Sequence, residues 1–281
     1  MLECVVNLSE GRDRSVLARL AGAAGEALLD LQFDPDHNRS VLTLAGDDVE
    51  EAVRAVARVA VQTIDLGHHT GVHPRLGAVD VVPFTPLDGA GTPMPGGADL
   101  SPALAARGRF ADWAADELEL PCFFYGPERA LPEVRRSAFA ELAPDRGPAR
   151  PHPTAGACAV GARPVLVAYN LWLDTGDVAV AQKVAAEVRG PMVRALGLAV
   201  GRAGHSSQVS CNLIEPAELG PEEAYELVAA AARARGATVV RAELVGLVPK
   251  ALVEAVPIER RAHLDLGLER TVEARLEARP G

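Results

Sequence analysis

The chain has 281 residues, 48% of them hydrophobic and 23% charged, and carries a formal net charge of −10 at pH 7. This balance predicts a folded globular protein and excludes disorder over most of the length. No uninterrupted apolar run is long enough to span a membrane, and the start lacks the pattern of a secretory signal. The acidic balance, without a long Lys/Arg run, argues against nucleic acid as a partner.

The four cysteines are scattered along the chain and form no CxxC pair, so they do not make a zinc motif. We expect them to be buried thiols in a reducing cytoplasm. They are Cys4, Cys122, Cys158 and Cys211.

Strand and helix signals alternate in the first half of the chain. Apolar runs bounded by turn residues predict strands over 2–8, 27–33, 41–44 and 77–84. Apolar residues at helical spacing predict helices over 14–28 and 47–64, the first of them capped by Asp13. After a Pro/Gly-rich insertion we expect a helix over 100–118, a strand over 121–125 and an irregular or partly helical connection over 127–153.

The second half repeats the order β-α-β-β-α-β, with strands over 164–173, 192–200, 207–214 and 237–245 and helices up to 189 and over 221–235. A last helix is expected over 266–276. This order is that of the ferredoxin-like arrangement, so we predict an α+β protein with two such subdomains, 1–164 and 165–281. Both helices of each unit cover one sheet face, and polar loops favour a ligand cleft between the two sheets over a sealed seam.

Three histidines lie within six positions of one loop, at His68, His69 and His73. A metal site is disfavoured, because adjacent histidines point apart and no HExxH motif or carboxylate triad accompanies them. His73 differs from the other two, since it lies between two glycines, Pro74 follows it and Arg75 comes next. A histidine held in this way beside an anion-binding arginine suits general acid–base chemistry near neutral pH.

Each of two further polar segments allows two interpretations. The segment 34–39 is either an ordinary turn or a polar loop that aims Arg39 at a carboxylate. The segment 147–157 is either a linker or, because three prolines stiffen it, a wall for a flat ligand. We find no nucleophile elbow and no glycine-rich phosphate loop.

Several segments together resemble glutamate formiminotransferase, the folate-dependent enzyme of histidine breakdown. They are residues 3–11, 36–41, 73–84, 161–163 with 168–170, 208–213 and 243–249. The resemblance covers nearly the whole chain and only the transferase part of the family, without a cyclodeaminase. It implies two α/β subdomains whose sheets face each other around a folate cleft, in a cytoplasmic homodimer.

The resemblance also implies the reaction, transfer of a formimino group from N-formimino-L-glutamate to N5 of tetrahydrofolate as co-substrate, without a metal. The catalytic histidine of the family falls on His73, which would act as general base. We expect substrate binding by Asn38, Arg39, Arg75, Asn170 and Asn212, with the arginines on carboxylates. The folate-binding stretch of the family falls on Gly147, Pro148, Ala149, Arg150, Pro151, His152, Pro153, Thr154, Ala155 and Gly156.

The sequence departs from residues that family members often carry at Gln32, Val72, Pro164 and Trp172. Val72 stands where an acidic neighbour of the catalytic histidine is common. Two alternatives follow: a folate-dependent paralogue with another one-carbon or amidine donor, and a folate-binding protein without transferase activity.

Overall fold

The computed structural model describes residues 1–201 and 206–279, and its contacts divide the chain into unit 1, Met1–Pro164, and unit 2, Val165–Gly281. Each unit combines one sheet with several helices, so the predicted α+β class is confirmed. Among the described residues, no helix is both long and apolar enough to cross a membrane. The same residues contain no group of three or more His, Cys, Asp or Glu side chains placed to hold a metal ion.

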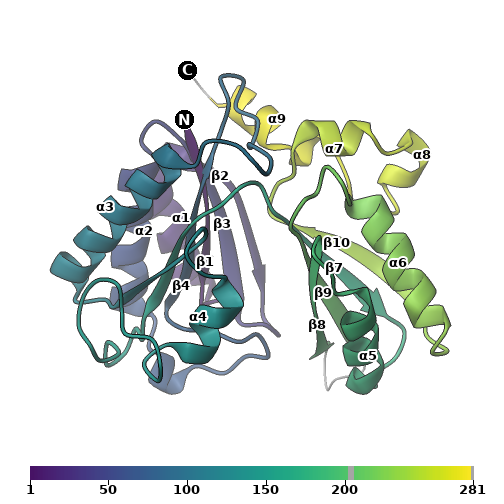
Figure 1. Cartoon of the computed structure of the whole chain (residues 1–281), viewed down its shortest axis with the longest axis horizontal. Coiled ribbons are helices and arrows are strands. Elements are labelled where there is room, and N and C mark those ends of the chain that lie inside the picture. Colours follow the sequence, from purple (N-terminus) through teal and green to yellow (C-terminus); the bar gives the residue numbers. More distant parts are fainter. Residues whose placement is uncertain (202–205, 280–281) are drawn as a thin grey trace. The chain divides into compact units, whose positions relative to one another are not determined.

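Unit 1 is built on a six-stranded sheet in the order β2-β3-β1-β4-β6-β5 (Figure 1). The pairs among β2, β3, β1 and β4 are antiparallel, whereas β6 pairs in parallel with both β4 and β5. Its elements are β1 Leu2–Leu8, α1 Arg14–Ala24, β2 Leu28–Asp34, β3 Arg39–Gly46, α2 Val49–Thr63, β4 Val79–Pro86, α3 Ser101–Leu118, β5 Cys122–Tyr125, α4 Leu131–Ser137 and β6 Cys158–Ala162.

Two sequence predictions for unit 1 need correction. The first helix ends at Ala24 and not at residue 28, because Gly25 adopts φ +56° and a short 3-10 turn follows. The sequence did not predict β6, a run of small, fully buried residues that completes the parallel part of the sheet. The predicted cap is confirmed, since the Asp13 carboxylate accepts the N–H groups of Ser15 and Val16.

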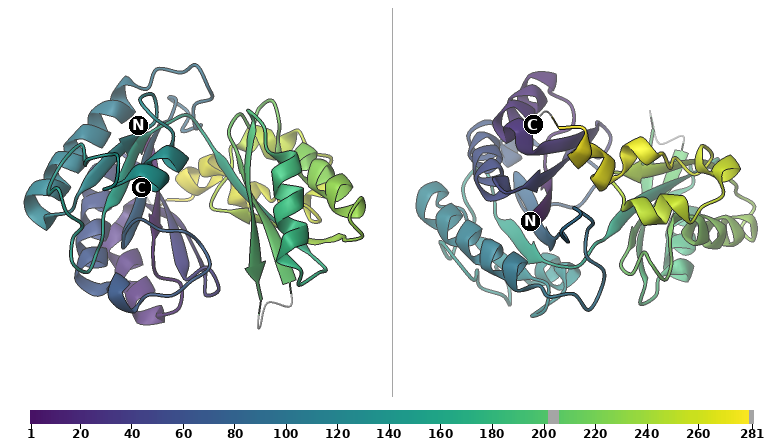
Figure 2. Two further views of the ribbon diagram at one scale, coloured as in Figure 1. Left: turned by 60° about the horizontal axis from the view of Figure 1, so that its bottom comes forward. Right: turned by 90° about the horizontal axis from the view of Figure 1, so that it is seen from above.

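The three long helices of unit 1 lie over one face of its sheet (Figure 2). Alternate residues of β1, among them Cys4 and Val6, point into that core and are fully buried. On the opposite face a smaller core forms beneath α4, where Phe123 and Val134 are fully buried. All four cysteines of the chain are free and buried, as predicted.

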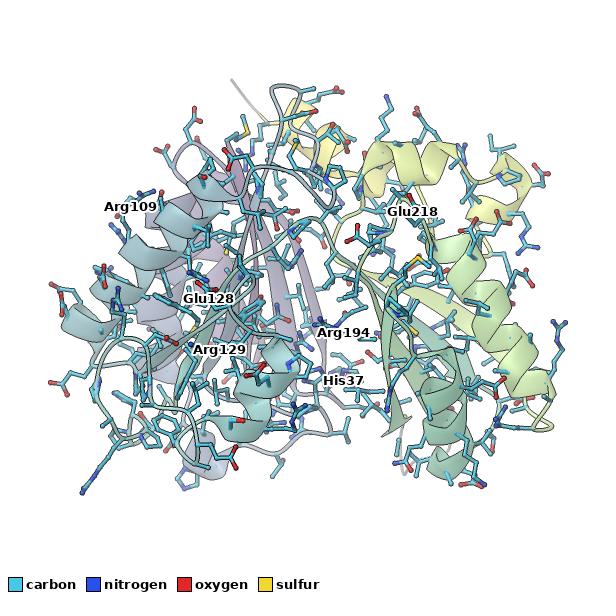
Figure 3. The ribbon with its side chains drawn as sticks, in the orientation of Figure 1. His37, Arg109, Glu128, Arg129, Arg194 and Glu218 are labelled. Carbon is cyan, nitrogen blue, oxygen red and sulfur yellow. The ribbon has the colours of Figure 1, made fainter. Side chains whose placement is uncertain are left out.

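Two ion pairs fix the loop that leads from β5 into α4. Arg107 of α3 donates to Glu128 at 2.7 Å, and Arg129 donates to Asp145 at 2.7 Å. Glu128 and Arg129 stand side by side in this loop (Figure 3). The Arg107 side chain is buried and that of Glu128 is 40% exposed, so this contact is only partly shielded from water. Both ion pairs help to set the position of α4, which carries a residue of the site described below.

Unit 2 has a four-stranded antiparallel sheet in the order β10-β7-β9-β8, and α5 and α6 lie over one of its faces (Figure 1). Its elements are β7 Val167–Leu173, α5 Val178–Val188, β8 Val193–Val200, β9 Ser206–Leu213, α6 Pro221–Arg233, β10 Val239–Val245, α7 Lys250–Glu254, α8 Ile258–Arg261 and α9 Val272–Glu277. The last helix starts later than predicted, because a 3-10 turn occupies Leu268–Arg270 and Thr271 caps α9.

Candidate active site

His73 lies in the loop between α2 and β4, and both of its ring nitrogens have partners. The Nδ1 atom is 2.7 Å from the Pro74 carbonyl, and the Nε2 atom is 2.5 Å from Nη1 of Arg39. A carbonyl oxygen can only accept a hydrogen bond, and a guanidinium can only donate one. These partners therefore assign the proton to Nδ1 and the lone pair to Nε2.

Charge and burial keep His73 neutral. Burial lowers its pKa well below the ordinary value of 6.5, and the positive charges of Arg39 and Arg135 lower it further. His37, at the turn before β3 (Figure 3), acts in the same direction with its ring centroid 5.8 Å away. At neutral pH the Nε2 lone pair is thus available to a proton donor.

Arg39, the first residue of β3, contacts the His73 ring through its guanidinium. Burial lowers its pKa to about 10; the negative charge of Asp80 opposes this change, and the positive charge of Arg135 adds to it by a smaller amount. No ion pair joins Arg39 to a carboxylate in the described part of the chain, and its buried Nε finds no acceptor there. A buried guanidinium with an unused donor is suited to bind an anionic ligand.

Asp80 and Arg135 form a buried ion pair that the sequence did not single out. Arg135 of α4 donates from Nη2 to Oδ2 of Asp80 at 2.6 Å and from Nη1 to Oδ1 at 3.1 Å. Oδ1 also accepts the backbone N–H of Leu76 at 2.6 Å, and Nη1 lies 3.3 Å from the Pro74 carbonyl. The pair therefore fastens the loop on both sides of Arg75.

Arg75, predicted to bind a substrate carboxylate, contacts its own loop in this structure. It donates to the carbonyls of Gly71 and His73, each at 2.9 Å, and to Nδ1 of His69. His69 in turn contacts the Asn38 carbonyl through Nε2, at 3.1 Å. Arg75 shapes the backbone around His73, and its predicted substrate contact stays a prediction.

Asn38 joins three segments of unit 1. Its φ of +48° lies in the left-handed region, which asparagine tolerates better than most residues. The side-chain oxygen accepts the N–H of Gly11 at 2.9 Å, and the side-chain nitrogen donates to the Thr70 carbonyl at 2.9 Å. The amide thereby ties the turn before β3 to the loop after β1 through its oxygen and to the His73 loop through its nitrogen.

The predicted folate-binding stretch meets the His73 loop at one of its ends. Residues 147–151 are exposed, whereas His152 and Gly156 close a turn by exchanging two backbone hydrogen bonds of 2.7 and 3.0 Å. Gly156 forms a β-bridge with Gly77, and the Ala155 carbonyl accepts the N–H of Ala78 at 2.9 Å. This contact brings the stretch next to the segment that carries His73.

Asn170 and Asn212 belong to unit 2. Asn170 lies on β7 and donates to Glu243 of β10 at 3.2 Å, and Trp172 donates to the same carboxylate oxygen at 3.1 Å. Arg241 stacks over the Trp172 ring at 4.2 Å and donates to the other Glu243 oxygen at 2.9 Å. Asn212 is exposed on β9. Asn170 is thus held by Glu243, an acidic residue to which the sequence analysis assigned no role.

Comparison with known proteins identifies the family of the chain. Residues 1–163 match the family described as "Formiminotransferase domain, N-terminal subdomain". The chain is 36% identical to the glutamate formimidoyltransferase of Streptococcus pyogenes serotype M1, over 90% of this chain and 91% of that protein. It is 34% identical to the enzyme of the same name from Thermoplasma acidophilum, over 89% and 88% of the two chains. The formimidoyltransferase-cyclodeaminase of Sus scrofa is 33% identical over 91% of this chain but 51% of its own length.

These matches define the class as a transferase similar to the glutamate formimidoyltransferases. The chain belongs to the formiminotransferase family, as its motifs predicted. The match covers about nine-tenths of the Streptococcus pyogenes and Thermoplasma acidophilum proteins. It covers about half of the formimidoyltransferase-cyclodeaminase of Sus scrofa.

Proposed function

We propose that the protein transfers the formimino group of N-formimino-L-glutamate to N5 of tetrahydrofolate, with His73 as general base. The similarity to glutamate formimidoyltransferases along about nine-tenths of both chains carries the choice of reaction. Two observations support His73 as the base: its lowered pKa keeps it neutral near pH 7, and its Nε2 atom faces the guanidinium of Arg39 and therefore carries a lone pair.

The proposed proton path uses one atom of the protein. Nε2 of His73 accepts the proton that N5 loses as the new carbon–nitrogen bond forms at the amidine carbon. The resulting imidazolium then donates this proton to the departing glutamate nitrogen, so the histidine is neutral again at the end of the cycle. Nδ1 keeps its proton throughout and donates it in a hydrogen bond to the Pro74 carbonyl, which leaves Nε2 as the reacting atom.

Arg39 is proposed to bind a carboxylate of the glutamate donor or of the folate tail. Its Nη1 contacts Nε2 of His73 in this structure, so the guanidinium must turn away before that nitrogen can accept a proton. A carboxylate is a stronger acceptor for a guanidinium than an imidazole nitrogen is, because the bond is charge-assisted. Substrate binding would therefore release the base at the moment when it is needed.

The residues present fit a reduced folate with its acidic tail. The buried Nε of Arg39 lacks an acceptor within the described residues. Residues 147–151 offer an exposed surface, and the other end of the same stretch contacts the His73 loop through Gly156. Tetrahydrofolate would supply the nucleophilic N5, and the protein residues would orient it and manage its proton. The predicted substrate contacts of Arg75, Asn170 and Asn212 belong to this same proposal.

We also propose that both units are ferredoxin-like. The orders β10-β7-β9-β8 and β2-β3-β1-β4 each place the first strand of the unit between its fourth and its third, which supports that topology. The homodimer, the cytoplasmic location and the folate cleft are further predictions from the family.

A second candidate is a folate-dependent transferase with a different donor. Val72, next to His73, has an apolar side chain that is 45% exposed where family members often carry an acidic one. An acidic neighbour would attract the cationic amidine group, so its replacement favours a neutral or otherwise altered donor.

The test is an incubation of the protein with tetrahydrofolate and N-formimino-L-glutamate, with N-formyl-L-glutamate and N-formimino-L-aspartate in parallel. The proposal expects 5-formiminotetrahydrofolate by absorbance and an equal amount of free glutamate by mass spectrometry. Turnover with only one of the other donors would support the second candidate. Binding of tetrahydrofolate without turnover with any donor would contradict both and favour a non-catalytic folate-binding protein.

A further inference from the structure

One backbone carbonyl, that of Pro74, receives two donors from different parts of unit 1. Nδ1 of His73 lies 2.7 Å from it, and Nη1 of Arg135 lies 3.3 Å from it. A carbonyl oxygen has two lone pairs and can accept both. The Pro74 carbonyl therefore sets the tautomer of His73. Arg135, from a helix far along the chain, donates to the same carbonyl oxygen and helps to hold it in place.

The same arginine holds the loop from its other side. Its two-pronged contact with Asp80 is shielded from water, because the Asp80 side chain is 2% exposed and that of Arg135 is 19% exposed. Asp80 also binds the N–H of Leu76, so the carboxylate links α4 to the backbone three residues after His73. Planar pairing of this kind fixes direction as well as distance.

We propose that Arg135 is a positioning residue for His73, which holds the Pro74 carbonyl and the Asp80 carboxylate so that the imidazole keeps its Nδ1 proton and presents Nε2. This inference rests on the proposed function, in which His73 is the general base. Arg135 does not contact Nε2 of His73, the atom proposed to accept the proton. It acts through the loop, much as the aspartate of a Ser-His-Asp triad orients the histidine of that triad.

A purely structural ion pair would behave differently from a positioning residue. Loss of a structural pair would lower stability and leave the tautomer and pH response of His73 unchanged. Three groups face His73 and lower its pKa: Arg39 from β3, His37 from the preceding turn and Arg135 from α4. Removing Arg135 deletes one of these positive charges and leaves Asp80 without its counter-charge. Both changes raise the pKa of His73, so the acid limb of the activity profile, the fall of activity at low pH, moves to higher pH.

The experiment compares Arg135→Ala and Arg135→Lys with Arg136→Ala in the full-length protein. Arg136 is the next residue on α4, is exposed and has no ion pair within the described part of the chain. Its replacement by alanine therefore removes one positive charge from α4 but leaves the contacts with Asp80 and Pro74 intact. Steady-state kinetics give kcat and KM across pH. Nitrogen-15 NMR of the histidines, with His73 identified by its absence in His73→Gln, reports which ring nitrogen carries the proton.

We expect Arg135→Ala to lower kcat about tenfold to a hundredfold with little change in KM. We also expect it to give a mixture of His73 tautomers and an acid limb at higher pH, whereas Arg136→Ala matches the wild type. Arg135→Lys, which can reach one of the two oxygen partners, should fall between them, and it decides the question if the alanine variant does not fold.

An Arg135 variant that unfolds more easily but keeps the wild-type tautomer and acid limb would overturn the proposal. So would an Arg135 variant indistinguishable from Arg136→Ala. The NMR measurement needs no turnover. A protein that fails to transfer formimino groups, yet shows the change of tautomer, would overturn the proposed function and leave the positioning role intact.

Discussion

Nη1 of Arg39 lies 2.5 Å from Nε2 of His73, so a buried cation meets the lone pair of the proposed base. Burial lowers the pKa of both groups, that of Arg39 to about 10, and the charge of Arg39 lowers the pKa of His73 further. This contact is suited to respond to an anionic substrate, because a carboxylate that binds the guanidinium also frees Nε2 of the imidazole.

Replacement of Arg39 by methionine tests this idea. The change removes the charge and keeps much of the side-chain volume. We expect kcat/KM to fall about 10- to 150-fold, which corresponds to about 1.5–3 kcal/mol for a hydrogen bond to a charged group. Most of the loss should appear as a higher KM for the carboxylate-bearing substrate. The control is Arg19→Met, which removes an exposed arginine from α1. Equal losses in both variants would contradict a carboxylate-binding role for Arg39.

The pH dependence of activity has a predicted sign. A base must be deprotonated, and the pKa of His73 lies well below 6.5 because of burial and the neighbouring arginines. In the free enzyme, log(kcat/KM) should therefore be flat through neutral pH and decline only below the ordinary histidine range. Arg39→Met should move that decline to higher pH. A wild-type decline that begins above pH 7 would show that a different group is titrating.

The stability of the fold should depend on the same histidine. Its pKa is depressed in the folded state, so its contribution is fully present above the unfolded value of about 6.5. As the pH falls from there, the unfolded chain takes up a proton that the folded chain excludes, and stability declines. Thermal unfolding between pH 8 and pH 5 should show a smaller decline for His73→Gln than for the wild type. Parallel curves would contradict the depressed pKa.

Gly77 is predicted to tolerate no side chain. A Cβ at this position would lie 1.9 Å from the Ala157 carbonyl oxygen, where the His73 loop meets the segment before β6. Gly77→Ala should lower the free energy of unfolding by at least about 1–3 kcal/mol and reduce activity, because the loop must shift. Gly89→Ala is the matched control, since a Cβ there meets nothing within 4 Å. Urea denaturation measures both, and similar midpoints would count against the close contact.

Glu243 should stabilise the sheet of unit 2 by joining side chains of three of its strands. Its Oε2 accepts bonds from Asn170, Trp172 and Gln208, and its Oε1 accepts one from Arg241. An amide at this position would place N–H groups against these donors. We expect Glu243→Gln to cost about 1–3 kcal/mol, measured by urea denaturation with tryptophan fluorescence. Glu254→Gln, which weakens an exposed pair with Lys250, should cost far less. Comparable costs would contradict the network.

Local sequence signals predicted most of the fold and failed at β6. The first strand was expected with its observed bounds, Leu2–Leu8, because its apolar run ends sharply in turn residues. The strand Cys158–Ala162 is buried on both faces, so its small residues show none of the alternation that marks a half-exposed strand. Its partners β4 and β5 lie far along the chain, and no local pattern announces such a parallel pairing.

The candidate site was predictable where chemistry and backbone signals coincide. The rigid setting of His73 between glycines and before Pro74 is visible in the sequence, and so is the polar turn that carries Arg39. Arg135 is not, because it lies within a connection rich in Pro and Arg and contacts residues 55 and 61 positions earlier. A role for Asp80 could have been suspected from its place at the end of the His73 motif.

The most direct measurement is formimino transfer by wild type and His73→Ala at saturating tetrahydrofolate and N-formimino-L-glutamate, with folate binding measured in parallel. We expect turnover in the wild type, its loss in the variant, and nearly equal folate affinity in both. Undiminished turnover in His73→Ala, or no turnover in a wild-type protein that is folded and binds folate, would contradict this expectation.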